Sequence, residues 1–237
     1  MAPENHKIQS GTLFVVATPI GNLEDITLRA LATLRAVDIV ACEDTRKTGR
    51  LLQKHGIKKR LLSFYQPKEK HRIPVIMGHL LTGKTVALVS DAGTPGISDP
   101  GYSIIREAAG AGIEVVPIPG PSAVTAALSA GGLPTHRFLF LGFPPPKKAG
   151  LKKMLISLQK ETATLVFYLP VRKIQAFLEA VLETLGDRPI VIARELTKMH
   201  EEFIRGIPSQ LLESIDQKPL RGEATLLVEG TSRKKTS

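Results

Sequence analysis

The segment from Thr85 to Tyr102 constrains the fold of this chain more than any other stretch. Its residues 86–89 form a short apolar, valine-rich run, which is typical of a buried strand. Asp91 follows, in a stretch too rich in glycine and proline to be helical. Asp99 and Pro100 then have the pattern of a helix N-cap and first helical position. An acid at the end of a parallel strand, followed by a glycine loop, is where open α/β sheets bind ligands.

Strand-like and helix-like segments alternate through the first half of the chain. Strands are expected at 12–17, 38–42, 60–63, 86–89 and 114–118. Helices are expected at 26–36, 45–55, 68–81, 99–111 and 122–130. This alternation predicts an α/β fold with a mostly parallel sheet covered by helices.

Three of these strands end in loops rich in glycine and proline, at 18–22, 91–98 and 119–122. Because the carboxyl ends of parallel strands lie at one edge of a sheet, the loops are expected to line a single crevice. Each loop alone is an ordinary turn. Their coincidence indicates a ligand site, although a well-capped strand-to-helix connection remains an alternative for the central loop.

Two glycines and a proline at 131–134 are the best linker candidate, because they stop any continuing helix. The expected domains are residues 1–133, which carry the glycine and proline loops, and 134–237, which end in a basic tail. In the second domain, strands are expected at 138–141, 164–168, 189–194, 201–205 and 224–229, with helices at 148–158, 172–185 and 208–214. Some neighbouring strands are too close in sequence for helical crossovers, which indicates a mixed sheet.

The composition, with 43% hydrophobic and 23% charged residues, is that of a soluble globular protein. No apolar run approaches the ~20 residues of a membrane span, and the polar residues 1–10 lack a signal-peptide core. Cys42 is the only cysteine, and the six histidines show no metal-ligand spacing with it. We therefore expect a cytoplasmic protein, without a membrane partner, whose mechanism uses no metal.

The chain is basic throughout, with a formal net charge of +10. Residues up to Leu133 carry 15 basic and 11 acidic side chains, and the remainder carry 17 and 11. Both halves are positive, so a polyanion such as RNA is an expected partner. The densest clusters are Lys147-Lys148, Lys152-Lys153 and Arg233-Lys234-Lys235, and each alone is more often a solvated surface or a frayed end.

The common nucleotide and hydrolase motifs are absent from the sequence. No G-x-G-x-x-G follows the first strand, and neither a G-x-x-x-x-G-K-[ST] loop nor a G-x-S-x-G elbow occurs. Rossmann dehydrogenases, P-loop NTPases and α/β-hydrolases are therefore disfavoured. A crevice of backbone amides, one acid and small residues suits a compact ligand with a carboxylate and a cationic centre.

Six motifs together resemble a single family. They are Thr18-Pro19-Ile20-Gly21-Asn22-Leu23, Glu43-Asp44-Thr45-Arg46, Ser90-Asp91-Ala92-Gly93-Thr94-Pro95, Ser98-Asp99-Pro100-Gly101, Pro119-Gly120-Pro121-Ser122-Ala123 and Ala193-Arg194-Glu195-Leu196-Thr197-Lys198. The family is the ribosomal RNA small-subunit (cytidine-2′-O)-methyltransferases, the RNA branch of the tetrapyrrole methylase superfamily. The resemblance extends from about residue 11 to residue 230, with the motifs in the family's order.

The resemblance implies a two-domain tetrapyrrole-methylase-like fold with S-adenosylmethionine in the cleft between the domains, and a homodimer. It also implies the reaction, which is methylation of the 2′-hydroxyl of a cytidine in the decoding region of 16S ribosomal RNA. Carried over by motif, the cofactor-binding residues are Ile20, Gly21, Asp91, Gly93, Thr94, Ser122 and Ala123 in the first domain, and Tyr168, Ala193, Glu223 and Ala224 in the second.

Transfer of a methyl group to a 2′-hydroxyl indicates which catalytic groups to expect. The displacement needs alignment rather than a metal, and a protonated hydroxyl needs a base or electrostatic help. We expect Asp44 as the base or orienting group, Arg46 as a phosphate or alkoxide contact, and Lys198 as a further basic candidate. Alternatively, Asp44 or Thr45 caps the next helix, and Arg46 and Lys198 are surface residues.

The segment Leu169-Pro170-Val171-Arg172-Lys173 departs from the family's pattern, which usually has a glutamate, two variable positions and a His-Arg pair. Loss of the acid could weaken activity or change the target, or packing of Leu169 and Pro170 could replace it. Two alternatives to the RNA methyltransferase remain open. One is a methylase of the same fold acting on a tetrapyrrole or protein, and the other is an inactive ribosome-binding homologue.

Overall fold

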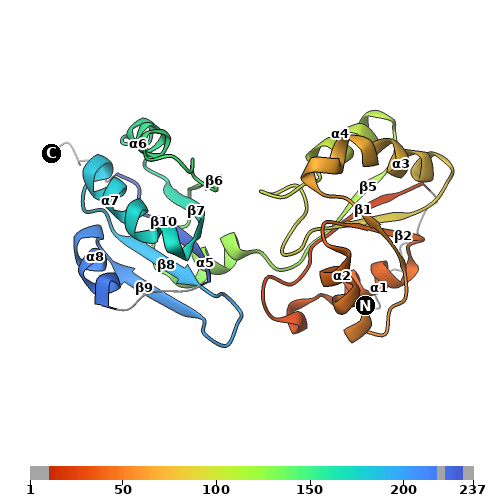
Figure 1. Ribbon diagram of the computed structural model, residues 1–237, viewed down its shortest axis with the longest axis horizontal. Helices are drawn as coiled ribbons and strands as arrows, with labels where there is room; N and C mark the ends of the chain where they lie inside the picture. Colours follow the sequence, from red (N-terminus) through yellow and green to blue (C-terminus); the bar gives the residue numbers. More distant parts are fainter. Residues whose placement is uncertain (1–10, 218–221, 232–237) are drawn as a thin grey trace. The chain divides into compact units, whose positions relative to one another are not determined.

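The computed structural model describes residues 11–217 and 222–231 of the chain. The expected polar amino terminus at 1–10 and the expected basic tail at 233–235 lie outside these residues. The described chain forms two compact units, one extending to Ser122 and the other beginning at Ala123 (Figure 1). No helix among the described residues is long and apolar enough to cross a membrane.

The first unit is built on a five-stranded sheet in which every pairing is parallel. The strand order is β3-β2-β4-β1-β5. The strands are β1 (Leu13–Val16), β2 (Ile39–Cys42), β3 (Arg60–Ser63), β4 (Val86–Val89) and β5 (Val115–Ile118), and the helices are α1 (Leu28–Ala36), α2 (Thr45–Lys54), α3 (Glu69–Leu81) and α4 (Tyr102–Gly110). The predicted parallel α/β organisation is confirmed.

Helices cover both faces of this sheet, which explains why its inner strands β1, β2 and β4 are continuously apolar. On β2, Val40 and Cys42 pack into a core that includes residues of α1 and α2. Their neighbours Ile39 and Ala41 point the other way, into a core that includes residues of α3 and α4. A strand with both faces buried cannot show the apolar–polar alternation of a half-exposed strand.

The start of α4 differs from the sequence prediction. The N-cap is Gly101, at φ 141°, and the helix begins at Tyr102 rather than after Asp99. The carbonyl of Pro100 accepts a hydrogen bond from the Gly96 N–H at 3.2 Å, which keeps Pro100 in the loop. A Cβ on Gly101 would lie 3.1 Å from Gly96 N and 3.2 Å from Leu88 Cδ2, so this close turn requires glycine.

The second unit contains a mixed five-stranded sheet of order β6-β7-β10-β8-β9, in which only β6 and β7 pair in parallel. The strands are β6 (Phe138–Gly142), β7 (Thr164–Pro170), β8 (Ile190–Arg194), β9 (Glu202–Gly206) and β10 (Glu223–Val228), and the helices are α5 (Ala123–Gly131), α6 (Lys148–Ser157), α7 (Ile174–Leu185) and α8 (Pro208–Gln217). The predicted mixed sheet is confirmed. β7 continues two residues beyond its predicted end, because Leu169 and Pro170 pair with β10.

Helix α5 packs with the second unit, although the expected boundary after Leu133 assigns it to the first domain. A Cβ on Gly131 would lie 2.5 Å from Leu227 Cδ1 of β10, so the end of α5 lies directly on the sheet. The Arg205 guanidinium donates to the carbonyls of Ala130 and Gly131, at 2.7 and 3.0 Å. The other face of the sheet forms an apolar core with α6, α7 and α8 that includes Phe167 and Phe177.

Candidate functional site

Two backbone hydrogen bonds join the loop after β1 to the loop after β4. The Thr18 N–H donates to the Gly93 carbonyl at 2.8 Å, and the Gly93 N–H donates to the Thr18 carbonyl at 3.0 Å. The buried Thr18 hydroxyl donates to the carbonyl of Ser90 at 3.0 Å. These bonds extend the sheet beyond the strand ends and fix the two loops against each other.

The loop after β5 meets the other two at glycine positions. Gly93 has φ +75°, and a Cβ there would lie 3.7 Å from Ile20 Cγ2 and 4.0 Å from the Pro121 carbonyl. A Cβ on Gly120 would lie 3.0 Å from the Cβ of Ala17. The prediction that the three loops meet at one edge of the sheet is therefore confirmed.

The predicted cofactor residues of these loops differ in exposure. Gly93 is buried where the loops meet, Gly21 is exposed, and the remainder are half-buried, namely Ile20, Asp91, Thr94, Ser122 and Ala123. The surface they form consists mainly of backbone and small side chains. Such a surface allows a ligand to approach the main chain closely and hydrogen-bond to it.

Asp91 connects the end of β4 to the start of α2. Its Oδ1 accepts from the Asp44 N–H at 3.0 Å, and its Oδ2 forms an ion pair with Lys47 Nζ at 2.8 Å. Its side chain is 22% exposed. Asp91 therefore helps to build the sheet edge as well as being the predicted acid of the central loop.

Asp44 is the N-cap of α2. Its Oδ1 accepts from the Arg46 N–H at 2.7 Å and from the Lys47 N–H at 3.4 Å. The hydrogen bond from the Arg46 backbone is the main cause that lowers the pKa of Asp44, which makes this carboxylate a weaker base. The capping alternative is confirmed for Asp44, and the side chain of Arg46 is exposed. A role for Asp44 in proton transfer stays a prediction that competes with the cap.

Glu43 and Lys47 are candidates that sequence reasoning missed. Burial raises the pKa of Glu43, and the negative charge of Asp91 raises it further. The hydrogen bond to Asp91 raises the pKa of Lys47. The Glu43-Asp44 pair in the sequence was the available signal, but it does not tell which carboxylate caps the helix. Burial also raises the pKa of the neighbouring Cys42 to about 11, so its thiol is neutral.

In the second unit, Tyr168 and Ala193 lie on one face of the sheet. Thr225 of β10 pairs with Tyr168 of β7 on one side and with Ala193 of β8 on the other, so the three residues form a row. Thr225 was not predicted from the sequence. Ala224 lies on the opposite face, with its side chain in the apolar core, and so only its backbone could contact a ligand.

Leu169 is buried in the same core and pairs with Ala224. Replacement of the family's acid by packing is therefore the alternative that the contacts of Leu169 support.

Lys198 and Glu223 are connected through Glu195. Glu195 Oε1 accepts from Lys198 Nζ at 3.0 Å and from the Glu223 N–H at 3.2 Å. Burial raises the pKa of Glu195, but these two hydrogen bonds outweigh it and the net shift is downward. Glu195 and Thr197 have φ of 49° and 65°, so the loop after β8 turns sharply here. Lys198 is thus a tethered residue rather than an unpaired cation.

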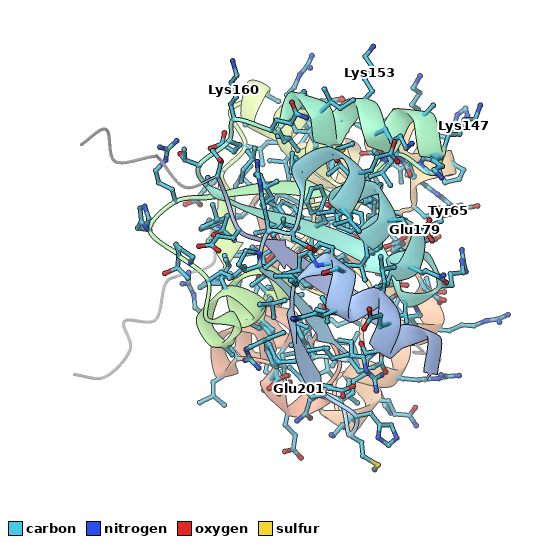
Figure 2. All side chains as sticks on the ribbon, turned by 90° about the vertical axis from the view of Figure 1, so that its left-hand side faces the viewer. Tyr65, Lys147, Lys153, Lys160, Glu179 and Glu201 are labelled. Carbon is cyan, nitrogen blue, oxygen red and sulfur yellow. The ribbon has the colours of Figure 1, made fainter. Side chains whose placement is uncertain are left out.

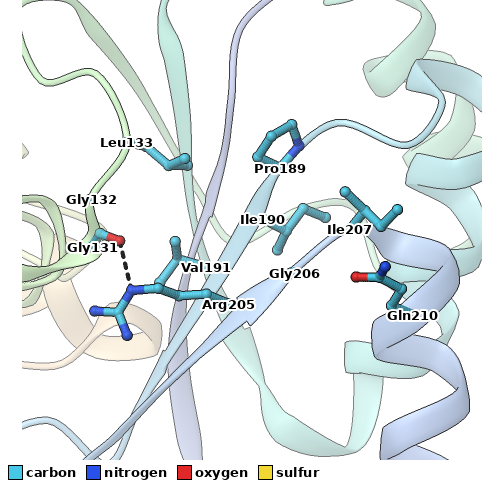
Figure 3. Close-up of a pocket in the computed structure, with 10 residues that line it drawn as sticks. All are labelled: Gly131, Gly132, Leu133, Pro189, Ile190, Val191, Arg205, Gly206, Ile207 and Gln210. Carbon is cyan, nitrogen blue, oxygen red and sulfur yellow. Dashed lines mark hydrogen bonds between the residues drawn. The ribbon is translucent and has the colours of Figure 1, made fainter.

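A hollow of about 320 Å³ lies beside Arg205 in the second unit (Figure 3). It is lined by Gly131, Gly132, Leu133, Pro189, Ile190, Val191, Arg205, Gly206, Ile207 and Gln210. None of the predicted site residues lines it, and the guanidinium of Arg205 is bound to the end of α5 (Figure 3). Within residues 11–217 and 222–231, no group of three or more histidine, cysteine or acidic residues could hold a metal ion.

Sequence comparison relates the chain to known proteins over almost its whole length. Residues 12–211 match the family described as Tetrapyrrole (Corrin/Porphyrin) Methylases. A protein of Thermotoga maritima named "Ribosomal RNA small subunit methyltransferase I" is 49% identical over 220 residues, which are 93% of this chain and 99% of the relative. A protein of the same name from Escherichia coli O157:H7 is 47% identical, over 93% of this chain and 78% of the relative.

A solved structure shares the fold. The uroporphyrin-III-C-methyltransferase of Thermus thermophilus superposes with a TM-score of 0.66, over 92% of this chain and 94% of that protein. Its sequence identity of 23% extends the likeness to the fold alone. The parallel first sheet and the mixed second sheet are therefore a known arrangement.

Proposed function

Since the chain belongs to the tetrapyrrole (corrin/porphyrin) methylase family, and within it to the group named ribosomal RNA small subunit methyltransferase I, we propose that it is an rRNA methyltransferase. Its methyl donor is S-adenosylmethionine, and its substrate is the small-subunit ribosomal RNA. The acceptor is the 2′-hydroxyl of a cytidine in the decoding region of 16S RNA. The protein acts in the cytoplasm, where ribosomes lie, and works as a homodimer.

One observation carries this proposal, namely the 49% identity that spans nearly the whole of both chains. The alignment spans 93% of this chain, so it extends over both units. The basic character of both halves is consistent with an RNA substrate.

The loops of the first unit fit the proposed cofactor. Gly93, at φ +75°, is buried where the three loops meet, and around it Gly21 is exposed while Ile20, Thr94 and Ser122 are half-buried, so a ligand can reach the loops there. The residues that would hold S-adenosylmethionine are Ile20, Gly21, Asp91, Gly93, Thr94, Ser122 and Ala123. When bound, it supplies an electrophilic methyl carbon for in-line displacement. Tyr168, Ala193, Glu223 and Ala224 stay predictions of the family resemblance.

Glu43 is the side chain that we assign to the acceptor hydroxyl. A base that works near neutral pH benefits from a pKa raised above the usual carboxyl range, and burial raises that of Glu43. Asp44 is shifted in the opposite direction and is occupied by the helix cap. We assign the exposed Arg46, at the start of α2, to a phosphate contact.

Transfer of a labelled methyl group tests the proposal and its alternatives together. Small ribosomal subunits that lack the modification are incubated with the protein and S-adenosylmethionine labelled in the methyl group, and free 16S RNA and a tetrapyrrole are tested in parallel. RNA, protein and tetrapyrrole are then separated and counted. We expect the label in the RNA of the subunit. Label in ribosomal protein or the tetrapyrrole, or no transfer by a protein that binds the cofactor, would overturn the proposal.

A further inference from the structure

The segment after β6 presents an aromatic ring to the solvent. Phe143 directly follows Gly142, the last residue of β6, and is 60% exposed. Prolines occupy 144–146, and α6 begins at Lys148. A single exposed apolar residue is common on protein surfaces, so Phe143 alone indicates nothing. The aromatic contacts of Phe143 and the cationic residues of the neighbouring segments distinguish it from such a residue.

The ring of Phe143 packs against an aromatic ring of the second sheet. Its centroid lies 5.5 Å from that of Tyr168, and Tyr168 makes an edge-on contact with Phe140 at 5.0 Å. The proline loop packs closely on α6, since a Cβ on Gly150 would lie 3.0 Å from the Cβ of Pro145. A ring that is already positioned loses little conformational freedom when a ligand binds to it.

The segment that follows this ring is rich in positive charge. No acidic residue occurs between 143 and 153, and Lys147, Lys148 and Lys153 are exposed. Figure 2 shows Lys147 and Lys153 projecting away from α6. Within the described part of the chain, these three lysines form no ion pair, whereas Lys152 pairs with Glu183 at 2.5 Å.

Two more cations lie at the same edge of the sheet. β6 and β7 are parallel neighbours, so the segments that follow them leave the sheet at one edge. The segment after β7 is a short turn, Val171–Lys173, in which Arg172 is exposed and Lys173 half-buried. These are the two positive charges of the segment that departs from the family pattern. We name Phe143, Lys147, Lys148, Lys153, Arg172 and Lys173 the Phe143 face.

We propose that the Phe143 face binds a single-stranded stretch of the RNA substrate, with one unpaired base stacked on Phe143 and nearby phosphates contacting the basic side chains. This inference rests on the proposed function. Unpaired RNA offers flat bases between phosphates, which is the pattern that an aromatic ring among cations recognises. A duplex hides its bases, and an acidic protein would use the lysines without needing the ring. Because Phe143 contacts Tyr168, a predicted cofactor residue, the stacked base would lie beside the methyl donor.

Equilibrium binding of a fluorescent, unstructured RNA oligonucleotide, followed by anisotropy without cofactor, tests the inference. Phe143→Ala should lower the affinity by about five- to a hundredfold, the range supplied by one stacked base, and Phe143→Tyr should retain most of it. The double variant Lys147→Glu/Lys153→Glu should weaken binding and reduce its dependence on salt. A duplex of the same sequence should be far less sensitive to Phe143→Ala.

Two matched controls come from the same region. Ile156 is an apolar residue of α6 that is 53% exposed, and Lys160 is an exposed cation just beyond the helix. Ile156→Ala and Lys160→Glu should change RNA affinity less than twofold. Equal losses in the controls and the Phe143 variant would overturn the inference. An unchanged RNA affinity in Phe143→Ala would also overturn it. So would a Phe143→Ala variant that binds vesicles of anionic lipid more weakly but RNA as well as the unaltered protein does.

Measurement of S-adenosylmethionine affinity separates this inference from the alternatives. If Phe143→Ala weakens cofactor binding but not RNA binding, the ring acts through Tyr168 and the inference is wrong. If the unaltered protein transfers no methyl group to RNA, yet its RNA binding depends on Phe143, the inference stands and the proposed function fails. If methyl transfer occurs and the variants bind RNA normally, only the inference fails.

Discussion

Gly93 occupies the point where three loops meet, and its backbone conformation requires glycine. At φ +75° the backbone of any residue with a Cβ is strained. The space around Gly93 is sufficient, however, because the nearest side-chain atom to a Cβ would be Ile20 Cγ2, at 3.7 Å. Gly93→Ala should therefore lower the free energy of unfolding by about 1–2 kcal/mol through the backbone alone. It should also weaken S-adenosylmethionine binding, measured by calorimetry.

Gly56 supplies the matched control, since its φ is +65° and nothing lies within 4 Å of a Cβ there. Gly56→Ala should reduce stability by a similar amount and leave cofactor affinity unchanged. If Gly93→Ala and Gly56→Ala bound the cofactor equally well, the meeting point of the three loops would be excluded as part of the cofactor site.

Asp91 combines two roles that different substitutions separate. Asp91→Asn keeps an oxygen that can accept from the Asp44 N–H but loses the charge that pairs with Lys47. We expect this variant to fold normally and to bind S-adenosylmethionine more weakly. Asp91→Ala should in addition lower the free energy of unfolding by about 1 kcal/mol, because the Asp44 N–H loses its acceptor. Unchanged cofactor affinity in both variants, measured by calorimetry, would restrict Asp91 to a structural role.

Substitution of Glu43 by glutamine should have opposite effects on stability and on activity. The pKa of Glu43 is raised from 4.5 by burial and by Asp91, so the folded state holds the proton more tightly than the unfolded state. The resulting destabilisation is absent well below 4.5 and complete above the raised pKa. Glu43→Gln should therefore increase the free energy of unfolding near neutral pH and lose this advantage in acid, as measured by denaturant titration. Methyl transfer should fall, and full activity would exclude Glu43 as the base.

The sequence identified the neighbourhood of the site but not the role of each carboxylate. Asp44 and Glu43 are adjacent, and both types accept protons and hydrogen bonds. Only the three-dimensional structure shows that Asp44 caps α2, whereas Glu43 is partly buried beside Asp91. For the same reason, the tether from Glu195 to Lys198 could not be read from the motif that contains both.

Among the secondary-structure elements, side-chain hydrogen bonds join the start of β2 to the start of β4. Asp38 Oδ2 accepts from the backbone N–H and the hydroxyl of Thr85, both at 2.8 Å. The backbone hydrogen bond is the main cause that lowers the pKa of Asp38 below 3.8. Asp38→Asn should lower the free energy of unfolding by on the order of 1 kcal/mol, kept small because the carboxylate is exposed.

The pH dependence of that difference follows from the direction of the shift. A lowered folded pKa gives stability that is present above 3.8 and lost as pH falls through the folded pKa. The difference in the free energy of unfolding between the unaltered protein and Asp38→Asn should therefore be constant near neutral pH and shrink in acid. A difference that widens in acid would contradict the assignment.

Most elements could be predicted because their signals are local. The buried strands of the first sheet are short apolar runs, as Val86–Val89 illustrates between the polar residues Thr85 and Ser90. The start of α4 was predicted wrongly, since Asp99-Pro100 has the pattern of a cap, whereas a hydrogen bond from Gly96 within the loop holds Pro100 outside the helix and Gly101 is the N-cap. The packing of α5 with the second unit depends on Leu227 and Arg205, which lie far along the chain.

For the whole molecule, the net charge of +10 gives a prediction about RNA binding. Each phosphate contact releases counterions and contributes a slope of about −0.7 to −0.9 to the dependence of log affinity on log salt. Several contacts should lower the affinity for small subunits by more than about tenfold between 50 and 200 mM salt. S-adenosylmethionine, which is small, should bind with little salt dependence. RNA binding that is insensitive to salt would contradict an electrostatic contribution from both halves.

The identity of the product nucleoside shows whether the protein methylates the ribose of a cytidine. RNA from small subunits methylated by this protein is digested to nucleosides, and the labelled nucleoside is identified by mass and fragmentation. We predict 2′-O-methylcytidine from one position of the RNA. Label on a base, on several unrelated positions or on a nucleoside other than cytidine would contradict the proposed 2′-O-methylation of one cytidine.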